Sequence, residues 1–113
     1  MDKPVAEKRR YRRYELLLPV EVIKIGDRHT RLRFQSRNIS CRGILLEDPE
    51  GLLEKGQLIE FLVFLPSAEE GVQVRVHCKG SVVRRDRARL STAAAMQRYE
   101  FERVLSKAAS AER

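Results

Sequence analysis

The chain has few of the residues on which metal and redox sites depend. Its 113 residues contain two cysteines, two histidines and no tryptophan, and aromatic residues make up 6% of the total. Cys41 and Cys78 are too few for a disulfide scaffold. Neither of them, nor His29 or His77, lies in a spacing typical of metal ligands. We therefore expect all four to be ordinary strand residues, with no metal site and no cofactor.

Motifs of catalysis and of membrane insertion are missing as well. The sequence has no Ser/His/Asp or Cys/His arrangement, no paired-carboxylate motif and no P-loop, so we do not expect an enzyme. Residues 1–13 are polar and basic, unlike the apolar region of a secretory signal. The densest apolar run, Phe61 to Leu65, is far too short to span a bilayer. We expect a cytoplasmic protein without a membrane span.

The composition is that of one globular domain. Apolar residues make up 42% of the chain and charged residues 35%, which excludes disordered and fibrous classes. A chain of 113 residues can bury a single modest core. There are no internal repeats or low-complexity linkers, so we expect the domain to fold alone.

The net charge of +7 is concentrated at the two ends. Residues 1–13 carry six Lys or Arg against two acidic residues, a net charge of +4. Residues 14–83 have a net charge of −1, and residues 84–113 again +4. A general nucleic-acid binder more often spreads cations along a groove that follows many phosphates. Two local clusters on a neutral body favour a compact anionic ligand.

Short stretches of alternating polarity predict an all-β fold. Residues 20–25 alternate with the two-residue period of a half-buried strand, Gly26-Asp27 supplies a turn, and residues 30–35 return. Further strands are expected at the following places: residues 43–47, 57–65, 72–79 and 81–83, with a bulge or bend at Gly80. Five or six strands at this spacing predict an antiparallel barrel or sandwich.

The C-terminal third is ambiguous. Ser91-Thr92 followed by Ala93 to Arg98 has the N-cap and the propensity of a helix, whereas closure of a barrel requires a last strand near residues 89–97. We place the strand first and the helix second. From Tyr99 to Ala111 we expect a helix. The expected organisation is a basic arm over residues 1–15, a barrel over 16–98 and a C-terminal helix or tail over 99–113.

Two arginines four residues apart, Arg9 and Arg13, stand in the basic arm. This spacing brings both side chains to one side of a helix or of an extended chain. Each guanidinium is a planar fork of donors that suits phosphate oxygens or the O6/N7 edge of guanine. The spacing is weak as a signal on its own, because an arginine-rich chain repeats it by chance, as at Arg33/Arg37 and Arg85/Arg89.

A small polar turn is expected at Asn38-Ile39-Ser40-Cys41-Arg42-Gly43. An Asn amide and a Ser hydroxyl can both donate to and accept from a base edge. Glycine permits a positive φ or a close approach of backbone to a ligand. Plain turns use the same residue types, so this segment too is weak by itself. Its place after the basic arm, a strand, a hairpin and a second strand is what gives it meaning.

That ordered set resembles the PilZ domain, the bacterial receptor module for cyclic di-GMP. The family signature is Arg-x-x-x-Arg ahead of the first strand, matched by Arg9 and Arg13, and then Asp or Asn followed by x-Ser-x-x-Gly. Asn38, Ser40 and Gly43 match this second part. Further agreement comes from Leu-Pro-Val at residues 18–20, Gly-Ile-Leu at 43–45 and the segment from Cys78 to Arg84. The resemblance covers about residues 8 to 98.

The resemblance implies a six-stranded antiparallel PilZ-type β-barrel with a basic N-terminal arm and cyclic di-GMP as ligand. Arg9 and Arg13 would contact phosphates and guanine edges, and Asn38 and Ser40 would form hydrogen bonds with a guanine. Gly43 would leave clearance, with secondary contacts from Arg10 and Arg42. Two departures from the family pattern are Cys41-Arg42, where small residues are common, and Ala94-Ala95-Met96, where a Gly-hydrophobic-x-Phe pattern is usual.

The leading hypothesis is therefore a receptor or adaptor that changes conformation on binding cyclic di-GMP and signals to an unidentified partner protein. A second hypothesis is a small basic barrel that binds RNA or single-stranded DNA, with Tyr11, Tyr14 and Tyr99 as the candidate stacking residues. A third is a degenerate PilZ domain that serves only in protein contacts.

Overall fold

The structure, a computed structural model, describes residues 14–105, in which six β-strands and no helix occur. The strands are β1 (Pro19–Ile25), β2 (Arg28–Ile39), β3 (Gly43–Glu47), β4 (Leu58–Leu65), β5 (Val72–Asp86) and β6 (Ser91–Leu105). All pairings between them are antiparallel, which confirms the expected all-β class and the six antiparallel strands. Nothing in this part of the chain forms a helix that could cross a bilayer.

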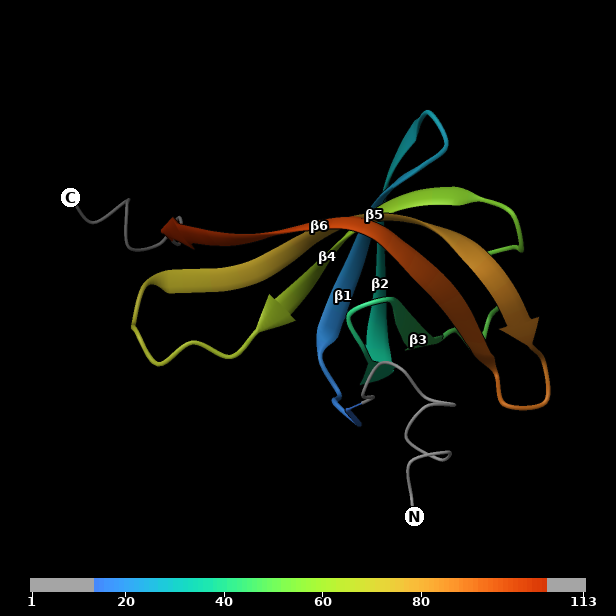
Figure 1. Ribbon diagram of the computed structural model, residues 1–113, viewed down its shortest axis with the longest axis horizontal. Coiled ribbons are helices and arrows are strands. Elements are labelled where there is room, and N and C mark those ends of the chain that lie inside the picture. Colours follow the sequence, from blue (N-terminus) through green and yellow to red (C-terminus); the bar gives the residue numbers. More distant parts are fainter. Residues whose placement is uncertain (1–13, 106–113) are drawn as a thin grey trace, which may run out of the picture.

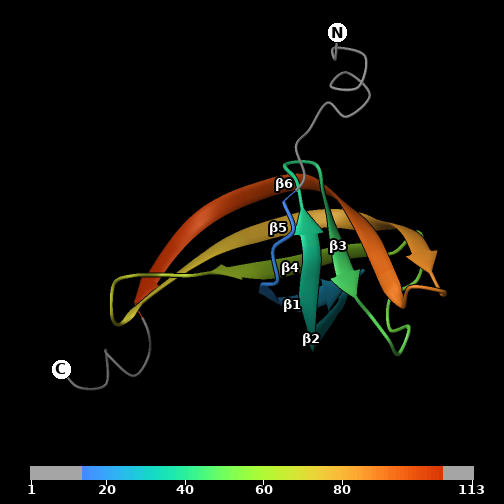
Figure 2. The same cartoon turned by 90° about the horizontal axis from the view of Figure 1, so that it is seen from below.

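The strand pairing closes on itself in the order β1-β2-β3-β6-β5-β4. Most neighbours are joined by hairpins, but β3 pairs with β6, far away in sequence, and β1 closes the ring by pairing with β4. Figure 1 shows β5 and β6 running together well beyond β1, β2 and β3, and Figure 2 shows how strongly they curve. The pairing of β3 with β6 matters most for function, because it sets the polar turn before β3 against the C-terminal strand.

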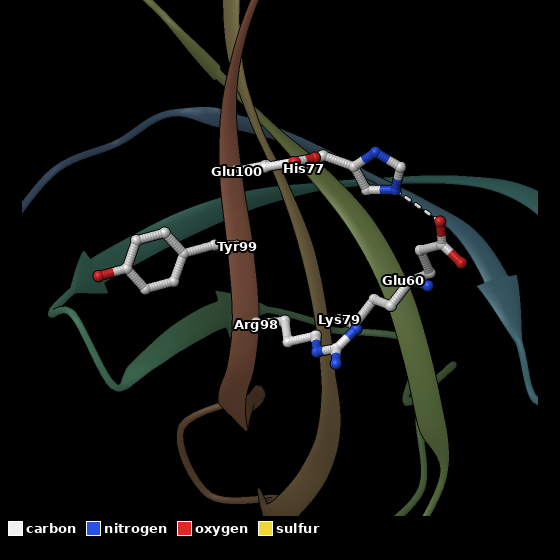
Figure 3. A pocket seen from close by; sticks show the side chains of 6 residues that line it. All are labelled: Glu60, His77, Lys79, Arg98, Tyr99 and Glu100. Atoms are coloured by element: carbon white, nitrogen blue, oxygen red, sulfur yellow. Dashed lines mark hydrogen bonds and ion pairs between the residues drawn. The ribbon is translucent and has the colours of Figure 1, made fainter.

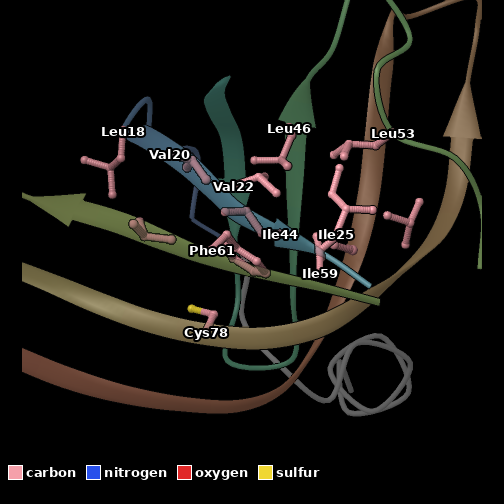
Figure 4. Close-up of a cluster of buried hydrophobic side chains, with 13 residues drawn as sticks. Leu18, Val20, Val22, Ile25, Ile44, Leu46, Leu53, Ile59, Phe61 and Cys78 are labelled. Carbon is pink, nitrogen blue, oxygen red and sulfur yellow. The ribbon is translucent and has the colours of Figure 1, made fainter. Parts of the chain in front are cut away.

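The core lies inside the barrel and follows the alternation visible in the sequence (Figure 4). Val20 and Val22 of β1 are buried, and a register shift between Val22 and Lys24 turns Ile25 back toward the interior. Phe61 of β4 is fully buried at the centre. The remaining core side chains are Leu18, Ile44, Leu46, Leu53, Ile59, Val63, Cys78, Val82 and Ala94. Burial of this apolar surface is the main favourable contribution to folding.

A buried carboxylate organises the loop between β3 and β4. Asp48 accepts hydrogen bonds from the backbone N–H groups of Leu52 (2.9 Å) and Leu53 (3.1 Å) and from the Thr92 hydroxyl (3.0 Å). The Arg85 guanidinium lies 3.5 Å from the same carboxylate and donates to the Asp48 carbonyl oxygen at 2.6 Å. The turn predicted at Asp48 to Gly51 thus forms, and it holds Leu53 in the core.

The expected C-terminal helix is wrong where the structure describes it. Residues Tyr99 to Leu105 continue β6 as an unbroken strand, and the rest of that prediction, from residue 106 to Ala111, lies outside the described residues. The strand alternative for residues 89–97 is correct from Ser91 onward. The cause is β5, which pairs with β6 from Asp86↔Ser91 to Val72↔Leu105 and so overrides the helix propensity of the alanine run.

Candidate functional site

The polar turn connects β2 to β3, as the sequence predicts. Asn38 is in the last part of β2, Ser40 to Arg42 form the turn, and Gly43 begins β3. The Ser40 N–H donates to the Gly43 carbonyl at 2.9 Å, and the Arg42 N–H donates to the Ser40 hydroxyl oxygen at 3.2 Å. The Ser40 hydroxyl donates to no acceptor within residues 14–105. Cys41, expected in a strand, lies in this turn instead and is exposed, because the loop needs a residue between the two strands.

The close approach of β6 explains why position 43 holds a residue as small as glycine. Gly43 is not among the glycines with positive φ, so the left-handed option is wrong. The close neighbour that the structure shows is the backbone of β6, and the expected clearance for a ligand stays a prediction. A Cβ on Gly43 would lie 3.2 Å from the Ala94 carbonyl oxygen, closer than most real contacts. The Met96 N–H also donates to the Arg42 carbonyl at 2.9 Å. The turn therefore packs directly against β6.

A cleft of about 200 Å³ opens beside the turn on the outer side of the barrel. It brings together Asn38, Ser40, Arg42 and Gly43, four of the predicted site residues. The other wall of the cleft consists of Val83, Arg84 and the three alanines at 93–95, and Ile44 and Leu45 complete the lining. The sequence did not predict these residues as part of the site. The small alanines leave room above β6, and the Arg84 side chain adds a cation. The run of three alanines was the available signal, but it favoured a helix.

Tyr14, in the last part of the expected basic arm, is attached to the end of β2. Tyr14 forms an isolated antiparallel bridge with Ile39, through N–H to carbonyl hydrogen bonds of 2.8 and 2.9 Å in the two directions. Ile39 stands between Asn38 and Ser40 in the sequence. Arg9, Arg10 and Arg13 themselves lie outside the described residues. Tyr14, the first described residue, is therefore fixed next to the polar turn.

A second, more open cleft of about 440 Å³ lies on the outer face of β4, β5 and β6 (Figure 3). The His77 imidazole stands between two carboxylates, with Nε2 2.5 Å from Glu60 and Nδ1 3.3 Å from Glu102. Arg75 donates to Glu102 at 2.8 Å, and this hydrogen bond, together with the His77 contacts, lowers the pKa of Glu102. The polar groups in this row satisfy one another, which favours a structural role.

The two thiols differ in environment. Cys41 is exposed in the turn, whereas Cys78 is buried in the core, where burial raises the pKa of its thiol to about 12. A thiol held neutral in this way is a poor nucleophile. Among residues 14–105 no three His, Cys, Asp or Glu side chains gather as metal ligands would.

The comparisons with known proteins agree with this geometry. No curated protein matches the chain. The family model described as the PilZ domain matches residues 7–109, nearly the whole of the 113-residue chain. This match includes residues 7–15 of the basic arm, the polar turn and every strand of the barrel. The chain therefore belongs to the PilZ domain family.

Proposed function

We propose that the protein is a receptor for cyclic di-GMP that changes conformation on binding and passes the signal to a partner protein. The family suggests this ligand, and PilZ domains are binding modules and not enzymes. The observation that carries the proposal for this chain is the bridge between Tyr14 and Ile39. Arg13 is bonded to Tyr14, and Ile39 stands between Asn38 and Ser40, so we propose that the Arg13 side chain can reach these two residues.

The cleft beside the polar turn would bind one part of the ligand. Its volume of about 200 Å³ is below the range of roughly 300 to 1,000 Å³ common for complete small-molecule sites. It therefore suits one guanine, with Asn38 and Ser40 bonding the base edge. The phosphates and the second guanine would need further donors, and these are the roles we assign to Arg9 and Arg13, with secondary contacts from Arg10 and Arg42. Neither half of the site is sufficient alone.

Ligand binding would act through the arm. A ligand with two phosphates and two guanines attracts cations from the arm onto the barrel, so the arm's position depends on the ligand. The surface formed by arm, ligand and barrel is then what a partner protein recognises. The ligand serves as a signal and is not transformed, since the proposal involves no bond making or breaking.

Isothermal titration calorimetry with cyclic di-GMP tests the proposal. We expect a dissociation constant of about 1 µM or lower, about 8 kcal/mol of binding free energy. Arg9→Ala and Arg13→Ala should each abolish the heat while the unfolding transition stays unchanged. Arg33→Ala is the matched control, because Arg33 is an exposed arginine of β2 that belongs to another Arg-x-x-x-Arg spacing. No heat with the wild-type protein, or equal affinity in all three variants, would refute the proposal.

A gel shift with single-stranded oligonucleotides separates this function from nucleic-acid binding. The proposed receptor should give no shift at physiological salt, because its cations form two local clusters and do not line a groove that follows many phosphates. A shift that cyclic di-GMP does not compete would instead indicate an RNA- or DNA-binding barrel.

A further inference from the structure

The distal half of β6 has an unpaired edge. β3 covers only Ser91 to Ala95 of this strand, and the Met96 N–H bonds to the turn. From Arg98 to Leu105, β6 pairs with β5 on one side, and no other strand between Tyr14 and Leu105 pairs with its second side. Figure 1 shows this part of β6 extending with β5 away from β1, β2 and β3. Its outward backbone N–H and C=O groups form a template for another strand.

The charges on this edge have both signs, so they do not by themselves oppose pairing with a second copy. Natural edge strands are protected by charged side chains, proline, bulges or a covering loop. Residues 98–105 contain no proline, and the charges of Arg98, Glu100, Glu102 and Arg103 cancel. Residues 98–105 are thus neutral, although the chain as a whole has a net charge of +7.

One face of the same segment is mostly apolar and exposed. The side chains of Tyr99, Phe101 and Leu105 are 48%, 69% and 61% exposed, and Arg103, on the same face, forms an ion pair with Glu69 at 2.6 Å. Tyr99 pairs in register with Cys78, a core residue, so this face continues the interior face of the barrel sheet into solvent. It also borders an apolar groove of about 290 Å³. Contiguous apolar surface of this kind marks interaction sites on soluble proteins.

We propose that the distal edge of β6 pairs antiparallel with the same edge of a second copy of this chain, forming a two-fold symmetric dimer. A strand that pairs with its own copy across a two-fold axis must be self-complementary, and residues 99–105 of β6 meet this condition. With the axis at Glu102, Tyr99 faces Leu105 of the second copy and Phe101 faces Arg103 of the second copy. These are an apolar pair and a cation–aromatic pair.

The one like-charge pair on the axis is compensated. The two Glu102 residues would face each other, which costs free energy when both are bare carboxylates. Each of them already accepts a hydrogen bond from Arg75 at 2.8 Å and contacts His77 at 3.3 Å. On the outer face of the dimer, each Glu102 carboxylate at the axis is therefore neutralised by Arg75 and His77 of its own copy. On the opposite face, the exposed apolar side chains of the two copies form one continuous surface.

A matched pair of leucines tests the interface. Leu105 and Leu58 are equally exposed, at 61% and 62%, but Leu58 lies at the start of β4, away from the edge. Sedimentation equilibrium should show a wild-type dimer that dissociates on dilution. Leu105→Lys should raise its dissociation constant at least about tenfold, ~1.4 kcal/mol, and Leu58→Lys should leave it unchanged. Phe101→Lys provides a second disruption should Leu105→Lys reduce folding, which the unfolding transition reports.

Two results would overturn the proposal: a monomeric wild-type protein at every concentration, or a dimer unaffected by both edge variants. Crosslinking then separates edge pairing from stacking of the apolar faces. In a Cys41→Ser background, Glu102→Cys should give a disulfide-linked dimer on a non-reducing gel, because the two positions meet on the axis. Stacked faces would keep residue 102 on the outside of each copy, so the absence of the crosslink would exclude edge pairing.

Discussion

Gly80 of β5 lies so close to Ala95 of β6 that a Cβ atom on Gly80 would overlap the Ala95 carbonyl oxygen. The two strands shift register between Lys79 and Gly80, which is the bulge expected from the sequence. A bulge increases the local twist and bends the strand. The bulge, with Gln97 as its extra residue in β6, lies between the cleft at Ala95 and the distal edge that begins at Arg98.

Gly80→Ala should therefore destabilise the fold by about 3 kcal/mol, because the obstruction is backbone and cannot rotate away. Urea unfolding measures the loss. Gly26→Ala is the control, since a Cβ there meets nothing within 4 Å and only the positive φ of 60° opposes it, at about 1 kcal/mol. Equal losses in the two variants would show that the strands can separate at the bulge.

Asp48→Ala should cost about 3 kcal/mol of stability. The substitution leaves the N–H groups of Leu52 and Leu53 and the Thr92 hydroxyl without their acceptor, in a buried position. Glu50→Ala, two residues away and exposed, should change the free energy of unfolding by less than about 0.5 kcal/mol. If the two variants unfold at the same urea concentration, Asp48 does not hold the loop.

Arg84→Ala should weaken cyclic di-GMP binding about tenfold, ~1.4 kcal/mol, without changing stability. Arg84 is exposed and lines the cleft opposite Asn38, where a guanidinium can reach a phosphate or a base edge. Arg87→Ala, in the β5–β6 turn and outside the cleft, is the matched control for titration calorimetry. An Arg84 variant that binds as tightly as the Arg87 variant would remove Arg84 from the site.

Glu102 should make stability depend on pH in the acidic range. Hydrogen bonding from Arg75, with the His77 contacts, holds the pKa of Glu102 below its usual value of 4.5 in the folded protein. The stabilisation is therefore present above the unfolded pKa and is lost as the pH falls through the folded pKa. The urea midpoint of the wild type should exceed that of Glu102→Gln at pH 7, and the gap should close in acid.

Arg75→Gln supplies the control for this pH effect. Without the arginine, the largest cause of the lowered pKa is gone, so adding Glu102→Gln in that background should change the midpoint at pH 7 much less. A gap between the two glutamate forms that stays constant from neutral to acidic pH would contradict the assignment.

Local patterns accounted for much of this fold. Alternation over residues 20–25 and 30–35 predicted the first hairpin. The turn residues from Asp48 to Gly51 predicted the end of β3, which the structure places at Glu47. These features depend on side-chain period and on backbone preferences that each short segment carries by itself. The two halves of the signature, Arg9/Arg13 and Asn38/Ser40/Gly43, likewise indicated the family that the match over residues 7–109 shows.

Only the tertiary structure decided the state of the C-terminal segment and the make-up of the cleft. The alanine run from Ala93 favours a helix locally, yet pairing with β5 makes it a strand, because ladder hydrogen bonds and burial outweigh a weak propensity. The pairing of β3 with β6 then brings Ala95 and Arg84 to Asn38. Residues some fifty positions apart meet through that register, which no local pattern encodes.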